Sequence, residues 1–154
     1  MVDRRVVVVG GVAGLLVGGG ALALGGDRFL YAVLRPGFSG PSLRVQEAFE
    51  QASVEDITLV DIRRPDEWAA TGSPRYGHRL DMQRDDFVAA LTRLVEGDRN
   101  APIALICARG VRSARLSNQL MEAGFTNIID VPEGMLGSDA GPGWLDWGLP
   151  VEHD

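Results

Sequence analysis

The sequence holds a single cysteine, Cys107, and only two histidines among its 154 residues. One cysteine excludes an intrachain disulfide and a cysteine-based metal cluster. His78 and His153 lie far apart in the chain and lack the spacing of ligands on one helix face, so no structural metal is expected. Whatever chemistry Cys107 performs is therefore that of a lone thiol.

Lysine is absent, since all fifteen basic residues are arginine, and the formal net charge is -6. No run of basic residues is longer than two. A protein that binds nucleic acid needs a basic face to meet the phosphates. The composition therefore argues against nucleic acid as a partner.

Charged side chains are also missing from residues 6–26, where eight of the 21 positions are glycine. A run of this length matches the roughly 20 residues that a membrane-spanning helix needs. The favoured interpretation is an uncleaved apolar helix that anchors the chain, with Phe29, Leu30 and Tyr31 at the far interface. A glycine-rich helix buried in the folded domain is the least favoured interpretation, because the run is terminal and follows two arginines.

A cleavable export signal is the alternative to an anchor. Arg4 and Arg5 would form its charged region, and Ala21-Leu22-Ala23 supplies a small-x-small cleavage site. The string around the two arginines also resembles a twin-arginine signal. Both interpretations of residues 1–34 predict contact with the membrane and place the rest of the chain on the non-cytoplasmic (periplasmic) side.

The remaining chain divides into a linker and one domain. Residues 35–41 are dense in proline and glycine, which is typical of a linker, and residues 42–154 are enough to form a core. Apolar patterning predicts strands and helices in alternation, with strands over 57–60, 78–82, 103–106 and 127–131 and helices over 42–52, 84–96 and 112–123, the first capped by Ser42. This order predicts an α/β fold with a central parallel sheet flanked by helices on both faces, preceded by the N-terminal apolar helix.

The loop after the predicted strand 103–106 carries the chemistry. Cys107 follows that strand directly, and ligands of open parallel sheets bind beyond the carboxyl ends of their strands. Gly110 allows a tight turn whose amides point inward, and the next helix adds its amino-terminal dipole. A thiol in such a cradle is expected to have a lowered pKa. Arg109 and Arg112 add positive charge that suits an oxyanion.

Three ordered motifs make the chain resemble the rhodanese family. Residues 107–113 resemble its active-site loop, Cys-x-x-Gly-x-Arg followed by Ser or Thr. Residues 61–68 resemble its Asp-x-Arg-x-x-x-Glu-aromatic block, and residues 134–151 its carboxyl-terminal block. The resemblance covers roughly residues 43–152. The family's Gly-His-Ile-Pro-Gly-Ala stretch is replaced by residues 72–77, and the usual Gly-Gly pair is Glu133-Gly134.

The resemblance implies a sulfurtransferase. Cys107 would take a sulfur atom from a donor such as thiosulfate as a persulfide and pass it to a thiol or cyanide acceptor, without metal or organic cofactor. The implied substrate-binding residues are those of the loop, namely Ala108, Arg109, Gly110, Val111 and Arg112. Asp61, Arg63 and Ser113 are expected to support the loop, the first two through a salt-bridge network. Besides a small sulfur donor and a thiol acceptor, a protein acceptor near the membrane is a candidate partner.

Other functions compete with this one. A phosphatase or arsenate reductase uses a similar cradle, but its loop is generally Cys-x5-Arg, whereas this chain has Cys-x4-Arg. A sulfur carrier or docking module without turnover is a second alternative that the sequence leaves open. Arg112 could also brace the loop through a carboxylate. A cysteine after an apolar strand is often a small buried hydrophobic residue. At Cys107 this interpretation is disfavoured, because Gly110, Arg112 and the start of a helix follow at the spacing of a reactive loop.

Overall fold

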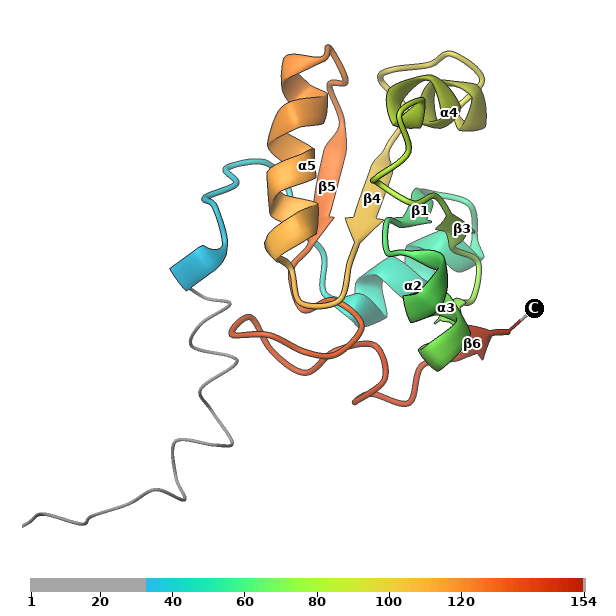
Figure 1. The fold of residues 1–154 in the computed structure, drawn as a ribbon, viewed down its shortest axis with the longest axis vertical. Coiled ribbons are helices and arrows are strands. Elements are labelled where there is room, and N and C mark those ends of the chain that lie inside the picture. The colour runs from blue at the N-terminus through green and yellow to red at the C-terminus, as the bar shows by residue number, and fades with distance from the viewer. Residues whose placement is uncertain (1–32, 154) are drawn as a thin grey trace, which may run out of the picture.

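The computed structural model describes residues 33–153 and shows a small α/β domain (Figure 1). Its helices are α2 (Val45–Ser53), α3 (Pro65–Thr71), α4 (Phe87–Leu94) and α5 (Val111–Glu122). Its strands are β1 (Thr58–Asp61), β2 (Ser73–Pro74), β3 (His78–Arg79), β4 (Ile103–Ile106), β5 (Ile128–Val131) and β6 (Val151–Glu152).

Four strands form a parallel sheet in the order β3-β1-β4-β5. The central strand β4 is buried at all four positions, because it is apolar throughout and has a strand on each side. All four strands point the same way, so β1 and β4 end at the same edge of the sheet in Figure 1. The loops that follow Asp61 and Ile106 therefore lie side by side, and both carry polar motifs from the sequence.

Alternate residues of the strands face two separate apolar clusters. One cluster packs the sheet against α4 and α5 through Phe87, Leu91, Leu116 and Leu120. The other packs the opposite face against α2 and Trp144. The predicted parallel sheet with helices on both faces is thus confirmed.

The carboxyl-terminal segment returns to the domain through a second, two-stranded sheet. Its strands β2 and β6 pair antiparallel, with Ser73 opposite Glu152. Trp144 is fully buried and donates from its Nε1 to the Pro150 carbonyl oxygen at 3.0 Å. This tryptophan fixes the segment under the sheet, whereas Trp147 is 47% exposed.

The prediction that Ser42 caps the first helix is wrong. Helix α2 begins at Val45, its N-cap is Arg44, and the side chain of Glu47 accepts from the Arg44 backbone N–H at 2.8 Å. The cause is a long-range contact, because the backbone of residues 41–43 is held extended against β5 through hydrogen bonds of Pro41 and Leu43 to Asp130. The carboxyl end of the segment expected to be a linker therefore pairs with the edge of the sheet.

The expected apolar helix, signal or anchor at residues 1–34 falls almost entirely outside the described residues. Within residues 33–153, no helix combines the length and the hydropathy of a membrane-spanning helix.

Candidate active site

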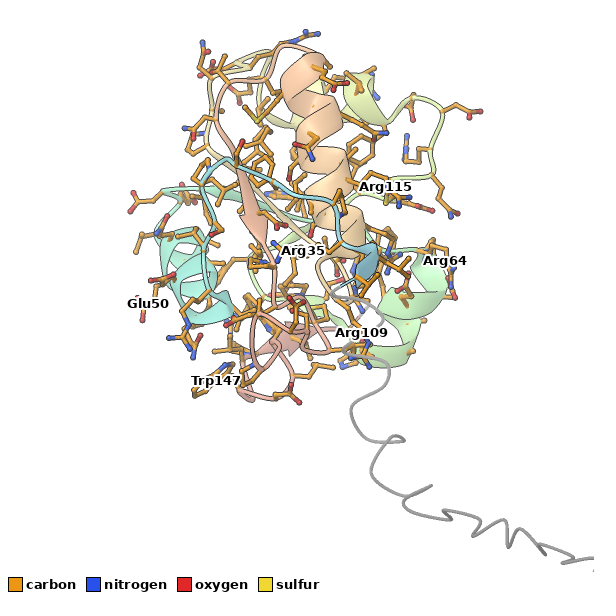
Figure 2. The ribbon with its side chains drawn as sticks, turned by 90° about the vertical axis from the view of Figure 1, so that its left-hand side faces the viewer. Arg35, Glu50, Arg64, Arg109, Arg115 and Trp147 are labelled. Atoms are coloured by element: carbon orange, nitrogen blue, oxygen red, sulfur yellow. The ribbon has the colours of Figure 1, made fainter. Side chains whose placement is uncertain are left out.

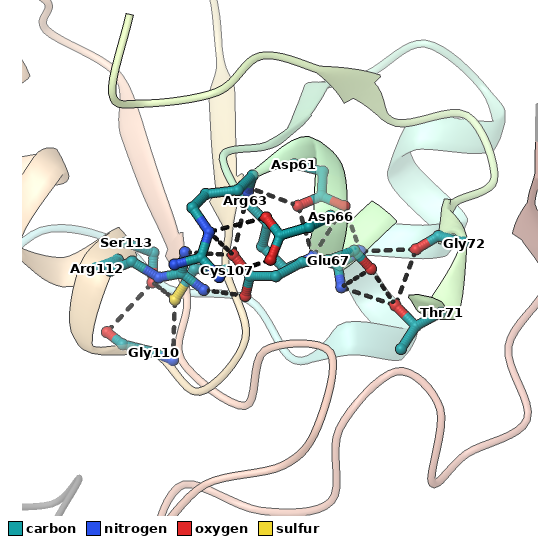
Figure 3. Close-up of polar contacts among 11 residues, drawn as sticks. Asp61, Arg63, Asp66, Glu67, Thr71, Gly72, Cys107, Gly110, Arg112 and Ser113 are labelled. Carbon is teal, nitrogen blue, oxygen red and sulfur yellow. Dashed lines mark hydrogen bonds and ion pairs between the residues drawn. The ribbon is translucent and has the colours of Figure 1, made fainter. Parts of the chain in front are cut away.

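Cys107 lies at the carboxyl end of β4, just before the loop that leads into α5. Its side chain is 1% exposed. The backbone N–H of Gly110 donates to Cys107 Sγ at 3.2 Å, and the thiol donates to Ser113 Oγ at 3.6 Å (Figure 3). Because Gly110 is also the N-cap of the twelve-residue helix α5, the sulfur sits at the positive end of a helix dipole, where negative charge is favoured.

The shape of the loop depends on two glycines. Gly110 has a φ of +79°, and a Cβ there would come 2.2 Å from the Pro132 carbonyl oxygen. Gly134 has a φ of +68°, and a Cβ there would lie 2.6 Å from the Ala108 carbonyl oxygen. The two glycines let the loop after β4 and the loop after β5 touch backbone to backbone.

Backbone hydrogen bonds join the same two loops. Met135 N–H donates to the Cys107 carbonyl oxygen, and Leu136 N–H donates to that of Ala108, both at 2.9 Å. The first position of the usual Gly-Gly pair is Glu133, which is buried and whose carboxylate accepts from Val45 N–H at 2.8 Å. The substituted residue therefore ties this loop to the start of α2 and leaves the contact with the cysteine loop intact.

Arg112, from the first turn of α5, forms a forked ion pair with Glu67 of α3. The distances from Nη1 to Oε2 and from Nη2 to Oε1 are 2.7 and 2.5 Å. These hydrogen bonds raise the pKa of Arg112 above its usual range against the opposing effect of partial burial, and the negative charges of Glu67 and of an ionised Cys107 raise it further. Both terminal nitrogens of Arg112 thus hold a carboxylate, so the arginine braces the loop and keeps a cation near the sulfur.

Asp61 and Arg63 form a buried ion pair at the end of β1. Arg63 is 1% exposed, and its Nη2 lies 2.7 Å from Asp61 Oδ2. The guanidinium also donates to Thr71 Oγ1 at 2.8 Å and to the Gly72 carbonyl oxygen at 2.7 Å. Figure 3 shows this network beside the Arg112–Glu67 pair. It joins the end of β1 to the carboxyl end of α3 and so holds the helix that carries Glu67.

A cavity of about 430 Å³ opens beside the cysteine loop. Its lining comes from four segments and includes Arg64, Glu67, Gln83, Ala108, Arg109, Arg112 and Leu136. Arg109 also donates to the Gly137 carbonyl oxygen at 3.2 Å, and Figure 2 shows it on the same face as Arg64. Of the predicted site residues, Ala108, Arg109 and Arg112 line this cavity, while Gly110, Val111 and Ser113 form the helix start behind it.

Sequence reasoning did not assign Glu67, Gln83, Arg64 or Leu136 to the site. Glu67 lies within the motif of residues 61–68. The sequence predicts that a carboxylate could pair with Arg112, but it does not identify Glu67 as that carboxylate. Leu136 follows Met135, whose N–H holds the loop, but nothing in its local pattern distinguishes it. Within residues 33–153, no group of three or more His, Cys, Asp or Glu side chains is placed to hold a metal ion.

The fold and the site together define a class of protein. It is a small α/β domain in which a lone cysteine ends the central strand of a parallel sheet, faces a helix amino terminus and lies beside an arginine-lined cavity. Residues 44–138 match the rhodanese-like domain family. The chain belongs to this family, as the motifs predicted.

Individual relatives agree with this assignment. The thiosulfate sulfurtransferase GlpE of Actinobacillus pleuropneumoniae is 31% identical over 106 residues, which are 69% of this chain and 87% of that protein. An uncharacterized protein of Rickettsia conorii is 28% identical over 104 residues, 64% of this chain and 85% of its own length. The solution structure of a polysulfide-sulfur transferase homodimer from Wolinella succinogenes is similar with a TM-score of 0.54 at 25% identity, covering 84% of this chain and 87% of that one.

The Arg112–Glu67 pair predicts a pH-dependent effect of Glu67→Gln. Burial alone would raise the pKa of Glu67, but the hydrogen bonds from Arg112 and the Arg64 backbone outweigh it, so the pKa is lowered. A lowered pKa stabilises the fold above the ordinary glutamate range, near pH 4, and this contribution disappears as pH falls through the folded-state value. We therefore expect the variant to be less stable than the wild type at neutral pH, and the difference to shrink in acid.

Urea unfolding of both proteins at neutral and at acid pH measures this difference. Glu47→Gln is the matched control, because Glu47 caps α2 as Glu67 caps α3, through the backbone N–H three residues earlier. The control measures the loss of the negative charge of a capping side chain alone, because the glutamine amide oxygen can still accept from the same N–H. A Glu67→Gln effect no larger than that of Glu47→Gln, or one that grows in acid, would contradict the assigned role of the ion pair.

Proposed function

We propose that this protein is a sulfurtransferase that carries sulfur on Cys107 as a persulfide. The observation that carries the proposal is the position of the sulfur, which accepts the Gly110 N–H at the start of α5 beside a cavity lined by three arginines. Such a site stabilises a thiolate and admits a small anion. The relatives that are thiosulfate sulfurtransferases support the same reaction class.

In the first step, the Cys107 thiolate attacks the outer sulfur of thiosulfate. A new S–S bond forms to Cys107 while the S–S bond of thiosulfate breaks, and its electron pair leaves with sulfite. The cysteine persulfide then carries the single negative charge that the thiolate had. The Gly110 N–H and the dipole of α5 favour that charge in both states, since each is fixed in place before the reaction.

In the second step, an acceptor thiolate or cyanide attacks the outer persulfide sulfur. The Cys107–sulfur bond breaks, its electron pair returns to Cys107 as thiolate, and the acceptor leaves with the sulfur. The cavity of about 430 Å³ has the volume of a small-ligand site. This volume is larger than thiosulfate requires, which is consistent with binding of a larger, thiol-bearing acceptor.

Phosphoryl transfer fits the site less well. Four residues separate Cys107 from Arg112, and both terminal nitrogens of that arginine are already occupied by Glu67. A phosphate ester would need a guanidinium free to fork onto its oxygens. The geometry therefore favours a single sulfur atom bound to Cys107 over a tetrahedral phosphoryl group.

Intact mass spectrometry of the full chain before and after thiosulfate tests the proposal. We expect the wild type to gain one sulfur atom, and Cys107→Ser to gain none. Addition of cyanide or a thiol should then return the wild type to its starting mass. Because the chain has one cysteine, the gain is assigned without further mapping. A wild type that gains no sulfur, while Cys107 still reacts with an alkylating reagent, would refute sulfur transfer.

We further propose that residues 1–34 place the domain on the non-cytoplasmic side of a membrane, which the apolar run behind Arg4 and Arg5 supports. The mass of the protein isolated from its own cells distinguishes the two forms of this segment. Retention of the full sequence supports an anchor. Loss of the residues up to Ala23 supports a cleaved signal, and a full-length protein recovered without membranes would contradict both.

A further inference from the structure

Asp130 is a fully buried carboxylate in β5, close to the cysteine loop. It lies outside the three motifs of residues 61–68, 107–113 and 134–151. It pairs with Leu105 of β4, and Cys107 is two residues beyond Leu105, so all three side chains face the α5 side of the sheet. Ser113 of α5 contacts the sulfur. Its hydroxyl accepts from Cys107 Sγ at 3.6 Å and donates to the Gly110 carbonyl oxygen at 3.2 Å.

The countercharge of Asp130 comes from Arg35, ninety-five residues earlier. Arg35 Nη2 lies 2.7 Å from Asp130 Oδ2, and the arginine side chain is only 23% exposed. Figure 2 shows Arg35 on the segment that leads into the domain. This segment lies before residues 44–138, the part that matches the family. It is also tied to α5 through Asn118 Nδ2, which donates to the Gly37 carbonyl oxygen at 3.0 Å.

Several buried polar atoms at and around the Arg35–Asp130 pair lack hydrogen-bond partners. Among the described residues, Asp130 Oδ1, Arg35 Nε and Ser117 Oγ are buried and have no hydrogen-bond partner. Arg35 is the cation that compensates the charge of Asp130. A buried carboxylate that loses its only strong partner either takes up a proton or imposes its charge on its neighbours.

We propose that Arg35 and Asp130 are a positioning pair for the reaction of Cys107, in which Arg35 neutralises a carboxylate that would otherwise oppose the thiolate and the persulfide. The carboxylate lies on the same face of the sheet as the sulfur, on the neighbouring strand, and Arg35 cancels its charge. The leading segment is then part of the reaction site and does not only connect the domain to residues 1–34. The effect of Arg35 on the persulfide rests on the proposed function. Its effect on the Cys107 thiolate is independent of that function.

Electrostatics supports this role. Burial raises the pKa of Asp130, while Ser113 and Arg35 offset part of the rise. Three other charged side chains near the loop already have partners, since Arg112 pairs with Glu67, Arg63 pairs with Asp61, and Arg109 donates to a carbonyl oxygen. Removal of Arg35 therefore leaves the Asp130 carboxylate without its cation, on the same face of the sheet as Cys107. Any negative charge that Asp130 keeps there opposes negative charge on the sulfur.

The test is a double-mutant cycle on the full-length protein, with the pH profile of Cys107 alkylation by iodoacetamide as the readout. We expect Arg35→Gln to alkylate roughly tenfold more slowly at neutral pH, with the profile displaced to higher pH. Asp130→Asn should be no slower than the wild type, because it removes the opposing charge. The double variant Arg35→Gln/Asp130→Asn should return to within about threefold of the wild type.

Asn118→Ala is the matched control, because it removes the side-chain hydrogen bond that ties the segment to α5 and leaves the charges in place. It should keep the wild-type profile. A wild-type profile for Arg35→Gln, or a double variant as slow as Arg35→Gln, would overturn the proposal and leave the pair a docking contact. Circular dichroism verifies that each variant is folded, and the neutral double variant keeps the test valid if Arg35→Gln alone unfolds.

Sulfur loading separates this inference from the proposed function. If alkylation follows the cycle but thiosulfate adds no sulfur to any variant, the positioning role stands and sulfur transfer fails. If thiosulfate loads the wild type and Arg35→Gln equally fast, and their alkylation profiles coincide, sulfur transfer stands and the positioning role fails.

Discussion

Replacement of Gly110 by alanine is expected to reduce sulfur loading of Cys107 at least about 100-fold, because it displaces the loop that holds the sulfur. Two effects add at this position. The φ of +79° is unfavourable for any residue with a Cβ, and that Cβ would lie 2.2 Å from the Pro132 carbonyl oxygen. Neither side of the contact is a flexible side chain, so either the start of α5 or the loop after β5 must move.

The expected cost in the free energy of unfolding is roughly 2–5 kcal/mol, the sum of left-handed backbone strain and overpacking. Gly97→Ala separates the two effects. Gly97 has a similar φ of +87°, but a Cβ there meets no atom within 4 Å. We expect the control to lose roughly 1 kcal/mol and to load sulfur normally.

Thermal or urea unfolding and the rate of the mass increase with thiosulfate measure the two quantities for both variants. If Gly110→Ala loads sulfur as fast as Gly97→Ala, the contact between Gly110 and Pro132 does not fix the loop. The comparison also distinguishes a displaced loop from general instability, because a variant that is folded but fails to load has lost its geometry.

The cysteine loop could be predicted from the sequence because its determinants are local. A continuous apolar run, a glycine that takes positive φ, and the amphipathic helix after it lie within twenty residues and need no distant partner to be recognised. The strand 103–106 has the predicted bounds, and the helix predicted over 112–123 is observed one residue earlier, at Val111–Glu122. The parallel sheet followed from the alternation of such elements.

The partners of the loop could not be predicted, because they are set by packing between distant segments. Glu67 meets Arg112 across 45 residues, and Arg35 meets Asp130 across 95. Residues 35–41 have the composition of a linker, yet residues 41–43 pair with the open edge of β5. The composition of a segment indicates its flexibility. It does not indicate that the unpaired backbone groups of a distant edge strand will bind the segment.

The buried Asp61–Arg63 pair is expected to contribute strongly to the free energy of unfolding. Arg63→Met is expected to lower the free energy of unfolding by roughly 3–5 kcal/mol, because it leaves the Asp61 carboxylate without a countercharge in a dry environment. The substitution also removes donors to Thr71 and Gly72, which hold the end of α3. Urea unfolding at neutral pH measures the loss.

The double variant Asp61→Leu/Arg63→Met is expected to be more stable than Arg63→Met alone, since an apolar pair of similar size avoids the stranded charge. Arg84→Met is the surface control, because Arg84 and Asp86 form an ion pair in which both side chains are about half exposed. That control should leave stability nearly unchanged.

A double variant as unstable as Arg63→Met would show that the cost comes from the lost donors to α3 and not from Asp61. That distinction matters for the site, because α3 carries Glu67, whose carboxylate braces Arg112 beside the sulfur. If the donors dominate, Arg63→Met should also slow sulfur loading under conditions where it remains folded. If the stranded charge dominates, loading by the folded fraction should be close to that of the wild type.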